Sequence, residues 1–176
     1  MRSLLQEIKK TAVLALPICL GQLGHVLTGV ADYTMLGHTV PLEMAGATFA
    51  TSVFFPIMIL GLGFSIGLTP LVANANGAKD SRKVKTLFRT GFKLNLILGI
   101  LLLGVLLFFG NYLEVFNQPQ EVLDVCLDYY YIISFSIIPL MLFQAFKQFV
   151  EGLQDTKTPM VISLLGNVIN VILNYF

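Results

Sequence analysis

The chain has 176 residues, of which 56% are hydrophobic and only 12% are charged, with a formal net charge of +1. An ordinary soluble domain has about 25% charged residues, and a soluble core of this size could not bury so much apolar surface. The composition therefore excludes a soluble globular domain and favours a protein embedded in a lipid bilayer. The net charge by itself points to no particular partner.

The first ten residues are amphipathic and precede the first long apolar run. Leu4, Leu5 and Ile8 share one helical face, and charged residues occupy the other. This pattern predicts a short helix over residues 1–10 that lies on the cytoplasmic membrane surface. A cleavable signal peptide is the alternative, but the run that follows is too long for a signal core and contains polar residues.

Five apolar runs follow that are long enough, or nearly so, to cross a bilayer. A transmembrane helix needs about 20 mostly apolar residues, and the runs cover residues 11–37, 42–73, 87–109, 122–149 and 159–176. Prolines and glycines inside these runs are compatible with helices, because neighbouring helices can satisfy the carbonyl groups that they free. We predict an all-α membrane protein, a polytopic bundle with about five transmembrane helices.

The lysine and arginine residues occupy alternate connections between the predicted spans. They are Arg2, Lys9, Lys10, Lys79, Arg82, Lys83, Lys85, Arg89, Lys93, Lys147 and Lys157. The connections around residues 38–41 and 111–121 contain none. Because Lys and Arg collect on the cytoplasmic side, we predict a multi-pass protein of a cell membrane, such as the bacterial inner membrane, with a cytoplasmic N-terminus.

Polar residues follow one face of the first predicted span. Gly21, His25, Thr28 and Asp32 are spaced by four, three and four residues, which places them on the same side of a helix. Ionisable groups at membrane depth are costly and normally point into the bundle or a wet cavity. Asp32 is therefore a candidate functional carboxylate in the outward half, and His25 a candidate cavity-lining residue. The alternatives are an Asp32 that reaches headgroup water and a His25 that serves packing.

The fifth run carries a second polar stripe, made of Ser163, Asn167, Asn170 and Asn174 at the same spacing. Each amide has two donor hydrogens and an acceptor oxygen that lipid cannot satisfy. Hydrogen bonding between helices is one explanation, and lining a cavity is the other explanation for Asn167. Asn170 and Asn174 lie at a depth similar to that of Asp32. A carboxylate opposite amide oxygens suits a dehydrated cation such as sodium, or a hydrogen bond switched by a proton.

The chain offers no set of residues for catalysis. It has no nucleophile–base pair, no His/Cys cluster with metal-ligand spacing and no phosphate-binding motif. We therefore expect no enzyme activity, no cofactor and no nucleic-acid partner. The basic stretch 79–93 could bind anionic lipid headgroups, although its role in setting the orientation is a sufficient explanation.

Several short stretches occur in an order and at a spacing that match a known family, and they extend over essentially the whole chain. They are Leu16-Pro17, Val30-Ala31-Asp32-Tyr33-Thr34-Met35-Leu36-Gly37, Leu71-Val72-Ala73 with Gly77-Ala78, Phe143-Gln144-Ala145-Phe146, Phe149-Val150-Glu151-Gly152-Leu153-Gln154, Thr158-Pro159-Met160 and Gly166-Asn167-Val168-Ile169-Asn170. With these stretches the chain resembles the amino-terminal part of multidrug and toxic compound extrusion (MATE) transporters.

The resemblance implies a twelve-helix transporter of two six-helix lobes that uses a proton or sodium gradient to export organic cations. Asp32 matches the first-helix aspartate of the amino-terminal cation site, and Asn170 and Asn174 match the pair that stands opposite it. Some relatives carry an acid where this chain has Asn174, so the resemblance leaves the choice between proton and sodium open. Pro17 matches the proline at which the first helix is thought to bend.

The last apolar run ends abruptly, and two other functions are compatible with the sequence. The fifth run stops at Phe176 without a polar flank, so we expect an amino-terminal fragment whose partners are the missing helices. One alternative function is a lipid-linked saccharide flippase of the same superfamily, which would line its cavity with basic residues. The other is a non-transporting membrane scaffold with five spans.

Overall fold

The computed structural model describes the backbone of residues 2–36 and 41–175, and the side chains of most of them; those of residues 2–5, 7, 10, 25, 28, 31–36, 174 and 175 are outside its description. All elements in these ranges are helical, which confirms the predicted all-α class. They are α1 (Arg2–Leu36), α2 (Pro41–Ile66), α3 (Leu68–Gly77), α4 (Ser81–Gly110), the short 3₁₀ helix η1 (Leu113–Phe116), α5 (Gln120–Phe135), α6 (Ile137–Gly152) and α7 (Lys157–Tyr175).

Three long apolar helices dominate the described chain. The segments Pro41–Gly77, Ser81–Gly110 and Gln120–Gly152 are long and apolar enough to cross a membrane. They overlap the second, third and fourth predicted spans and extend beyond them at both ends. Within α1 and α7 the apolar parts found among the described residues are shorter, Thr11–Gly24 and Lys157–Leu173. That α1 and α7 also cross the bilayer stays a prediction.

Two of the long helices are interrupted in the same way, at Gly67 between α2 and α3 and at Ser136 between α5 and α6. Each interruption lies three residues before a proline, Pro70 or Pro139. Proline has no N–H to donate, and its ring collides with the carbonyl group four residues earlier. The chain therefore tightens at these points, where the amide groups of Gly67 and Ser136 donate to carbonyl oxygens only three residues back, at 3.2 Å and 3.1 Å.

The first helix is continuous from Arg2 to Leu36. The helix expected over residues 1–10 and the first predicted span are therefore joined without a break. No proline or glycine occurs between Arg2 and Leu16 to end a helix there. That the first ten residues lie on the membrane surface remains a prediction. Pro17 is inside α1 and is buried, whereas its neighbours Leu16 and Ile18 are 64% and 37% exposed.

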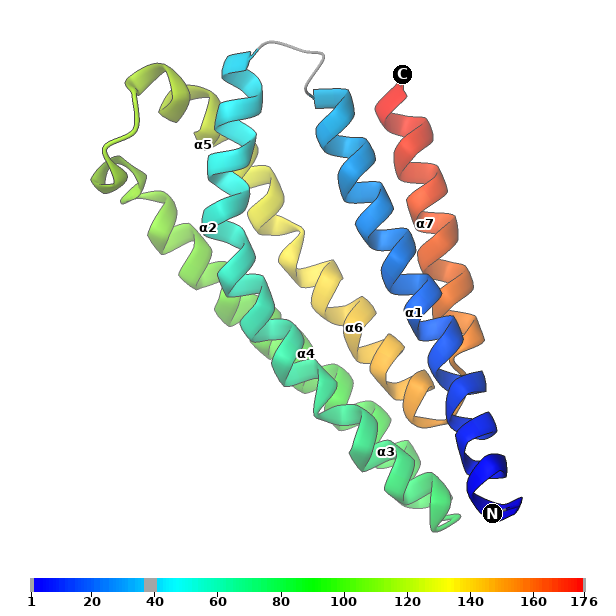
Figure 1. Cartoon of the computed structure of the whole chain (residues 1–176). Helices are drawn as coiled ribbons and strands as arrows, with labels where there is room; N and C mark the ends of the chain where they lie inside the picture. Colours follow the sequence, from blue (N-terminus) through cyan, green and yellow to red (C-terminus); the bar gives the residue numbers. More distant parts are fainter. Residues whose placement is uncertain (1, 37–40, 176) are drawn as a thin grey trace.

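The described helices form a body, made of α2 to α6, and a separate pair (Figure 1). In the body, α2 packs on α5, α4 packs on α6, and α3 lies against both α4 and α6. The pair consists of α1 and α7, which lie side by side and run in the same direction. Of the two, α7 also contacts α6, so that helix and the loop before it join the pair to the body.

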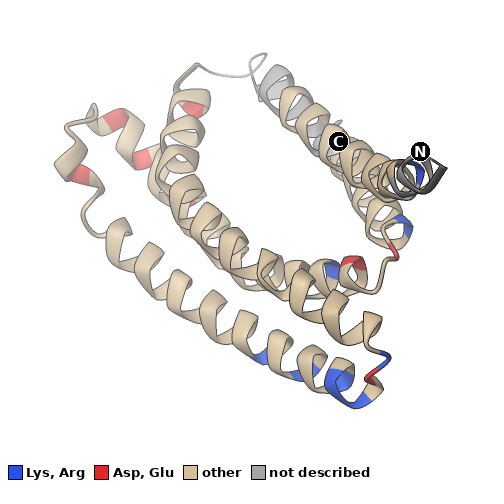
Figure 2. Ribbon diagram, turned by 60° about the horizontal axis from the view of Figure 1, so that its bottom comes forward, with Lys and Arg blue, Asp and Glu red and all other residues tan. Residues whose placement is uncertain are grey.

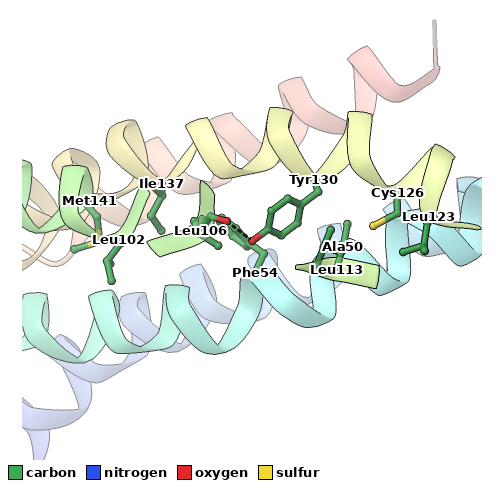
Figure 3. Packing of buried hydrophobic residues seen from close by; sticks show 10 residues of the cluster. All are labelled: Ala50, Phe54, Leu102, Leu106, Leu113, Leu123, Cys126, Tyr130, Ile137 and Met141. Carbon is green, nitrogen blue, oxygen red and sulfur yellow. Dashed lines mark hydrogen bonds between the residues drawn. The ribbon is translucent and has the colours of Figure 1, made fainter. Parts of the chain in front are cut away.

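A continuous apolar cluster holds the body together (Figure 3). Its buried members are Ala50, Phe54, Leu102, Leu106, Leu113, Leu123, Cys126, Tyr130, Ile137 and Met141. The hydroxyl group of Tyr130 donates to the carbonyl oxygen of Leu106 at 2.8 Å (Figure 3). Since an unpaired buried hydroxyl is costly, this bond explains how a tyrosine can occupy the centre of the cluster and link α5 to α4.

Two buried polar contacts add specificity to the packing of the body. The Ser65 hydroxyl of α2 donates to Asn95 Oδ1 of α4 at 2.5 Å, and Asn95 Nδ2 donates to the carbonyl oxygen of Gly91 at 2.9 Å. The Thr69 hydroxyl of α3 donates to Gln148 Oε1 of α6 at 2.6 Å. Each of these amides thus has a partner where lipid or apolar side chains would supply none.

Helix α7 begins at a side-chain cap in the loop that follows α6. Asp155 accepts hydrogen bonds from Thr158 Oγ1 at 2.6 Å and from the amide groups of Lys157 and Thr158, each at 3.1 Å. The bonds from Thr158 hold the pKa of the Asp155 carboxyl group below its ordinary value. The cap satisfies amide groups that would otherwise be free in the first turn, so the helix starts at a defined residue.

Charged side chains are unevenly distributed between the two ends of the bundle (Figure 2). Lysine and arginine gather at the end where α4 begins and α6 ends. At the opposite end, the acidic residues include Glu43, Glu114 and Glu121. This separation agrees with the alternation in the sequence, whereas the orientation relative to the cytoplasm stays a prediction.

Candidate functional site

The two polar stripes predicted from the sequence belong to the two helices of the pair. His25 and Asp32 are on α1, and Asn167, Asn170 and Asn174 are on α7. The side chains of His25, Asp32 and Asn174 lie outside the described part of the structure. For these three residues the structure therefore gives the position along a helix and no side-chain geometry.

Close contacts define how α1 and α7 are aligned. A Cβ atom added to Gly21 would lie 3.8 Å from the Cα atom of Met160, and one added to Gly24 would lie 2.8 Å from Leu164 Cδ2 and 3.1 Å from Asn167 Nδ2. Residues in contact therefore differ by 139 to 143 in sequence number. The two helices run in the same direction (Figure 1), so the offset measured at Gly21 and Gly24 can be extended to compare levels further along the pair.

The same alignment brings the predicted cation-binding positions to one level. Extended from Gly24 to Asp32, the offset places the backbone of Asp32 level with residues 171–175 of α7. This is the turn between Asn170 and Asn174. Of the two asparagines, Asn170 has a described side chain, which is half-buried. The described backbone thus brings Asp32, Asn170 and Asn174 to the same end of the same helix pair.

Asn167 occupies the contact between the two helices, one turn before Asn170. Its Nδ2 atom is buried and has no hydrogen-bond partner within the described structure. The atom lies close to the backbone of Gly24, where a larger residue would collide with Leu164. An unpaired buried donor costs about 1–3 kcal/mol. The expected hydrogen-bonding role between helices is therefore not seen for the Nδ2 donor of Asn167.

Two pockets meet at Asn167. The apolar pocket, of about 340 Å³, lies between α1 and α7 and is lined by Gly24, Leu27, Leu164, Asn167, Val168, Val171 and Ile172. The polar pocket, of about 370 Å³, lies between α1, α6 and α7 and is lined by Gly21, Gln22, Leu140, Phe143, Gln144, Lys147, Ile162, Ser163, Gly166 and Asn167. Asn167 thus borders both pockets, whereas its role in lining a substrate cavity stays a prediction.

The sequence analysis missed three residues of the polar pocket, Gln22, Gln144 and Lys147. A partial signal was present, because Gln144 and Lys147 are three residues apart on an otherwise apolar stretch of α6 and therefore share a face. Their convergence with α1 and α7 depends on tertiary contacts that no local spacing reveals. Among the described side chains, no three His, Cys, Asp or Glu residues gather as a metal-binding group.

Comparison with known proteins settles the family. The model of the family described as MatE matches residues 17–176 of this chain. The chain belongs to the MatE family. This membership confirms the resemblance noted in the sequence, and it places the helix pair in a membrane-protein family.

Two curated relatives illustrate the similarity. "Multidrug resistance protein NorM" of Photobacterium profundum is 27% identical over 170 residues, which are 97% of this chain and 37% of the relative. "Multidrug resistance protein MdtK" of Yersinia pestis is 29% identical over 176 residues, which are 99% of this chain and 38% of the relative. The chain therefore spans well under half the length of the relatives that it matches.

Proposed function

We propose that this chain is the amino-terminal part of a multidrug exporter that is driven by a gradient of protons or sodium ions. The observation that carries the proposal is the parallel pair of α1 and α7. When the offset at Gly21 and Gly24 is extended, it supports a common level for Asp32 and the turn between Asn170 and Asn174. Family membership and relatives whose names describe multidrug resistance support export as the activity. The process is transport, so no bond of the substrate is broken.

The proposed coupling step is a change of charge at Asp32. Protonation of its carboxylate, or binding of sodium to it with amide oxygens of Asn170 and Asn174, removes a charge that is costly at membrane depth. An ion that crosses the membrane contributes about 2.3 kcal/mol per 100 mV of potential, in addition to its concentration gradient. The gradient biases the transporter only if the two conformations differ in affinity for the ion.

The packing of the pair supports α1 as the moving element. Its contacts are mainly with α7, and most of its described side chains are exposed, with Pro17 the buried exception among them. The unpaired Nδ2 atom of Asn167 leaves the contact with α1 short of one hydrogen bond. A helix held by one neighbour through an imperfect contact can repack at small cost, and Pro17 is the natural place for it to bend.

The substrate is proposed to be an organic cation with apolar groups. The apolar pocket beside Asn167 is lined almost entirely by aliphatic side chains, and such a surface suits large apolar groups of varied shape. The remaining helices of the transporter would complete the cavity. A lipid-linked saccharide flippase remains the alternative, and it predicts transport of an anionic lipid substrate instead of a cation.

The decisive experiment replaces Asp32 by Asn in the full-length protein. Asp32→Asn keeps the shape of the side chain and fixes it in a neutral state, so we expect gradient-driven ethidium efflux from cells to fall to the background of cells without the protein. Asp128→Asn is the matched control, because Asp128 is an exposed carboxylate on α5. Expression and membrane insertion are measured in parallel for both variants. Undiminished efflux by Asp32→Asn at normal expression would contradict the proposal.

A further inference from the structure

We propose that the polar pocket between α1, α6 and α7 binds the anionic head of an amphiphile, either a carboxylate or a phosphate group, with Lys147 as the charged ligand. This inference rests on the pocket itself and on its place in a membrane protein. It does not require the proposed coupling at Asp32.

Polar side chains reach the pocket from all three helices that surround it. Gln144 and Lys147 come from α6, Ser163 and Asn167 from α7, and Gln22 from α1. The two residues on α6 are three apart and the two on α7 are four apart, so each helix presents its pair on a single face. Helices far apart in sequence thus converge on one space of about 370 Å³.

The chemistry of this lining selects an anion. Lys147 supplies a positive charge and three donor hydrogens, and the Ser163 hydroxyl and the two glutamine amides add neutral donors. None of the described residues that line the pocket is Asp or Glu. Glu151 is electrostatically coupled to Lys147 from one turn further along α6, but it is not part of the lining. The lining therefore combines one positive charge with several neutral donors, which a carboxylate or phosphate would complement.

The remaining lining explains why the ligand should be an amphiphile. Leu140, Phe143 and Ile162 form apolar walls beside the polar side chains. A small inorganic anion would leave these walls without contact, whereas an alkyl chain or an aromatic body would cover them. An anionic head joined to an apolar body matches both parts of the lining.

A simpler explanation accounts for Lys147 alone. A lysine five residues before the end of α6 can extend its ammonium group to interfacial water, with Glu151 as its partner. That explanation gives no reason for Gln22, Gln144 and Ser163 to line the same pocket as Lys147. The experiment therefore has to separate a bound ligand from a lysine that only reaches the interface.

The test measures binding of a fluorescent carboxylate amphiphile, 11-(dansylamino)undecanoate, to the full-length protein in phosphatidylcholine nanodiscs, with empty nanodiscs as background. No ion gradient is present, so probe binding is measured without transport. The result therefore does not depend on the proposed coupling at Asp32. We expect Lys147→Gln to raise the Kd by at least about tenfold, because a hydrogen bond to a charged group is lost, and Lys147→Arg to keep most of the affinity. The uncharged amide of the same probe should bind much more weakly than the carboxylate.

Lys157→Gln is the matched control, because Lys157 is an exposed lysine at the start of α7 that is not part of the pocket lining. Its Kd should equal that of the unmodified protein. Equal binding by Lys147→Gln and the unmodified protein would overturn the proposal, and so would equal losses in Lys147→Gln and Lys157→Gln. Tight binding of the uncharged probe would overturn it as well.

A second arm identifies the source of the anionic group. Nanodiscs that contain phosphatidic acid are compared with nanodiscs of phosphatidylcholine alone. Displacement of the probe by phosphatidic acid from the unmodified protein assigns the site to a lipid phosphate. Retention of the probe assigns it to a carboxylate amphiphile that enters from solution or from the membrane.

Discussion

Buried amides in this chain fall into two groups that differ in how well their hydrogen bonds are satisfied. Asn95 both accepts from Ser65 and donates to Gly91, and it links α2 to α4. Asn167 has a buried Nδ2 atom without a partner in the described structure. The same residue type therefore stabilises the body at one position and costs free energy at the other.

This difference predicts opposite effects of the same substitution. Asn95→Leu should lower the free energy of unfolding by about 1 kcal/mol, because it removes a buried contact between helices. Asn167→Leu should leave that free energy unchanged or raise it, since the unpaired donor disappears while the side-chain volume is nearly kept. Unfolding in mixed detergent micelles, followed by circular dichroism, measures both. Equal losses in the two variants would show that Asn167 has a partner after all.

At the scale of the elements, α3 and α6 approach each other closely at Gly152. A Cβ atom at this position would lie 2.7 Å from Val72 Cβ and 2.9 Å from the carbonyl oxygen of Thr69. The second of these is a backbone atom, which cannot move aside without shifting the helix. The crossing therefore depends on a residue without a side chain.

We expect Gly152→Ala to destabilise the protein by about 1–3 kcal/mol, because the added methyl group forces the helices apart. Gly104→Ala is the matched control in α4, where an added Cβ meets nothing within 4 Å in the described structure. There the substitution should be neutral or stabilising, since alanine favours helix more than glycine does. The unfolding midpoint of both variants decides this, and a Gly152→Ala midpoint at or above that of the unmodified protein would contradict the crossing geometry.

The sequence predicted which segments are helical, but it did not predict which helices pack against each other. The bilayer requires long apolar helices, so the presence of three long apolar segments followed from composition, whereas their ends did not: α4 begins at Ser81 and the predicted run began at residue 87. The interruptions before Pro70 and Pro139 were not predicted. Pro56 lies within the uninterrupted helix α2, so the presence of a proline does not by itself distinguish these cases. The pairing of α1 with α7 depends on tertiary packing.

The same limit applies to the candidate site. The spacing of Asn167 and its neighbours predicted a polar face on α7, and a common level with Asp32 followed from the alternation of the spans. The polar pocket could not be predicted, because Gln22 and Lys147 come from helices separated by more than a hundred residues. Local periodicity thus identifies which face is polar, whereas only the fold shows which polar faces meet.

At the scale of the whole molecule, the distribution of charge predicts the orientation in the membrane. The basic end of the bundle contains the loop between α3 and α4, and the opposite end contains the loop between α4 and α5 (Figure 2). Since lysine and arginine are retained on the cytoplasmic side, Gly77 should be cytoplasmic and Pro119 external.

Single-cysteine variants test this orientation in intact cells, after Cys19 and Cys126 have been replaced by serine. Pro119→Cys should react with a membrane-impermeant maleimide added outside, whereas Gly77→Cys should react only after the membrane has been permeabilised. Both positions are exposed in the structure, so accessibility to solvent does not differ between them. Labelling of Gly77→Cys from outside would reverse the assigned orientation.

The pairing of the first and last described helices also has a consequence for biosynthesis. Gly24 contacts Leu164, which is 140 residues further along the chain, and ribosomes add about 5–20 residues per second. Helix α1 therefore waits on the order of ten seconds in the membrane before its main neighbour exists. Until then, something other than α7 has to shield the polar face of α1 from lipid. The nascent chain should therefore depend on the cell's insertion machinery for longer than a protein whose successive helices pair as they emerge.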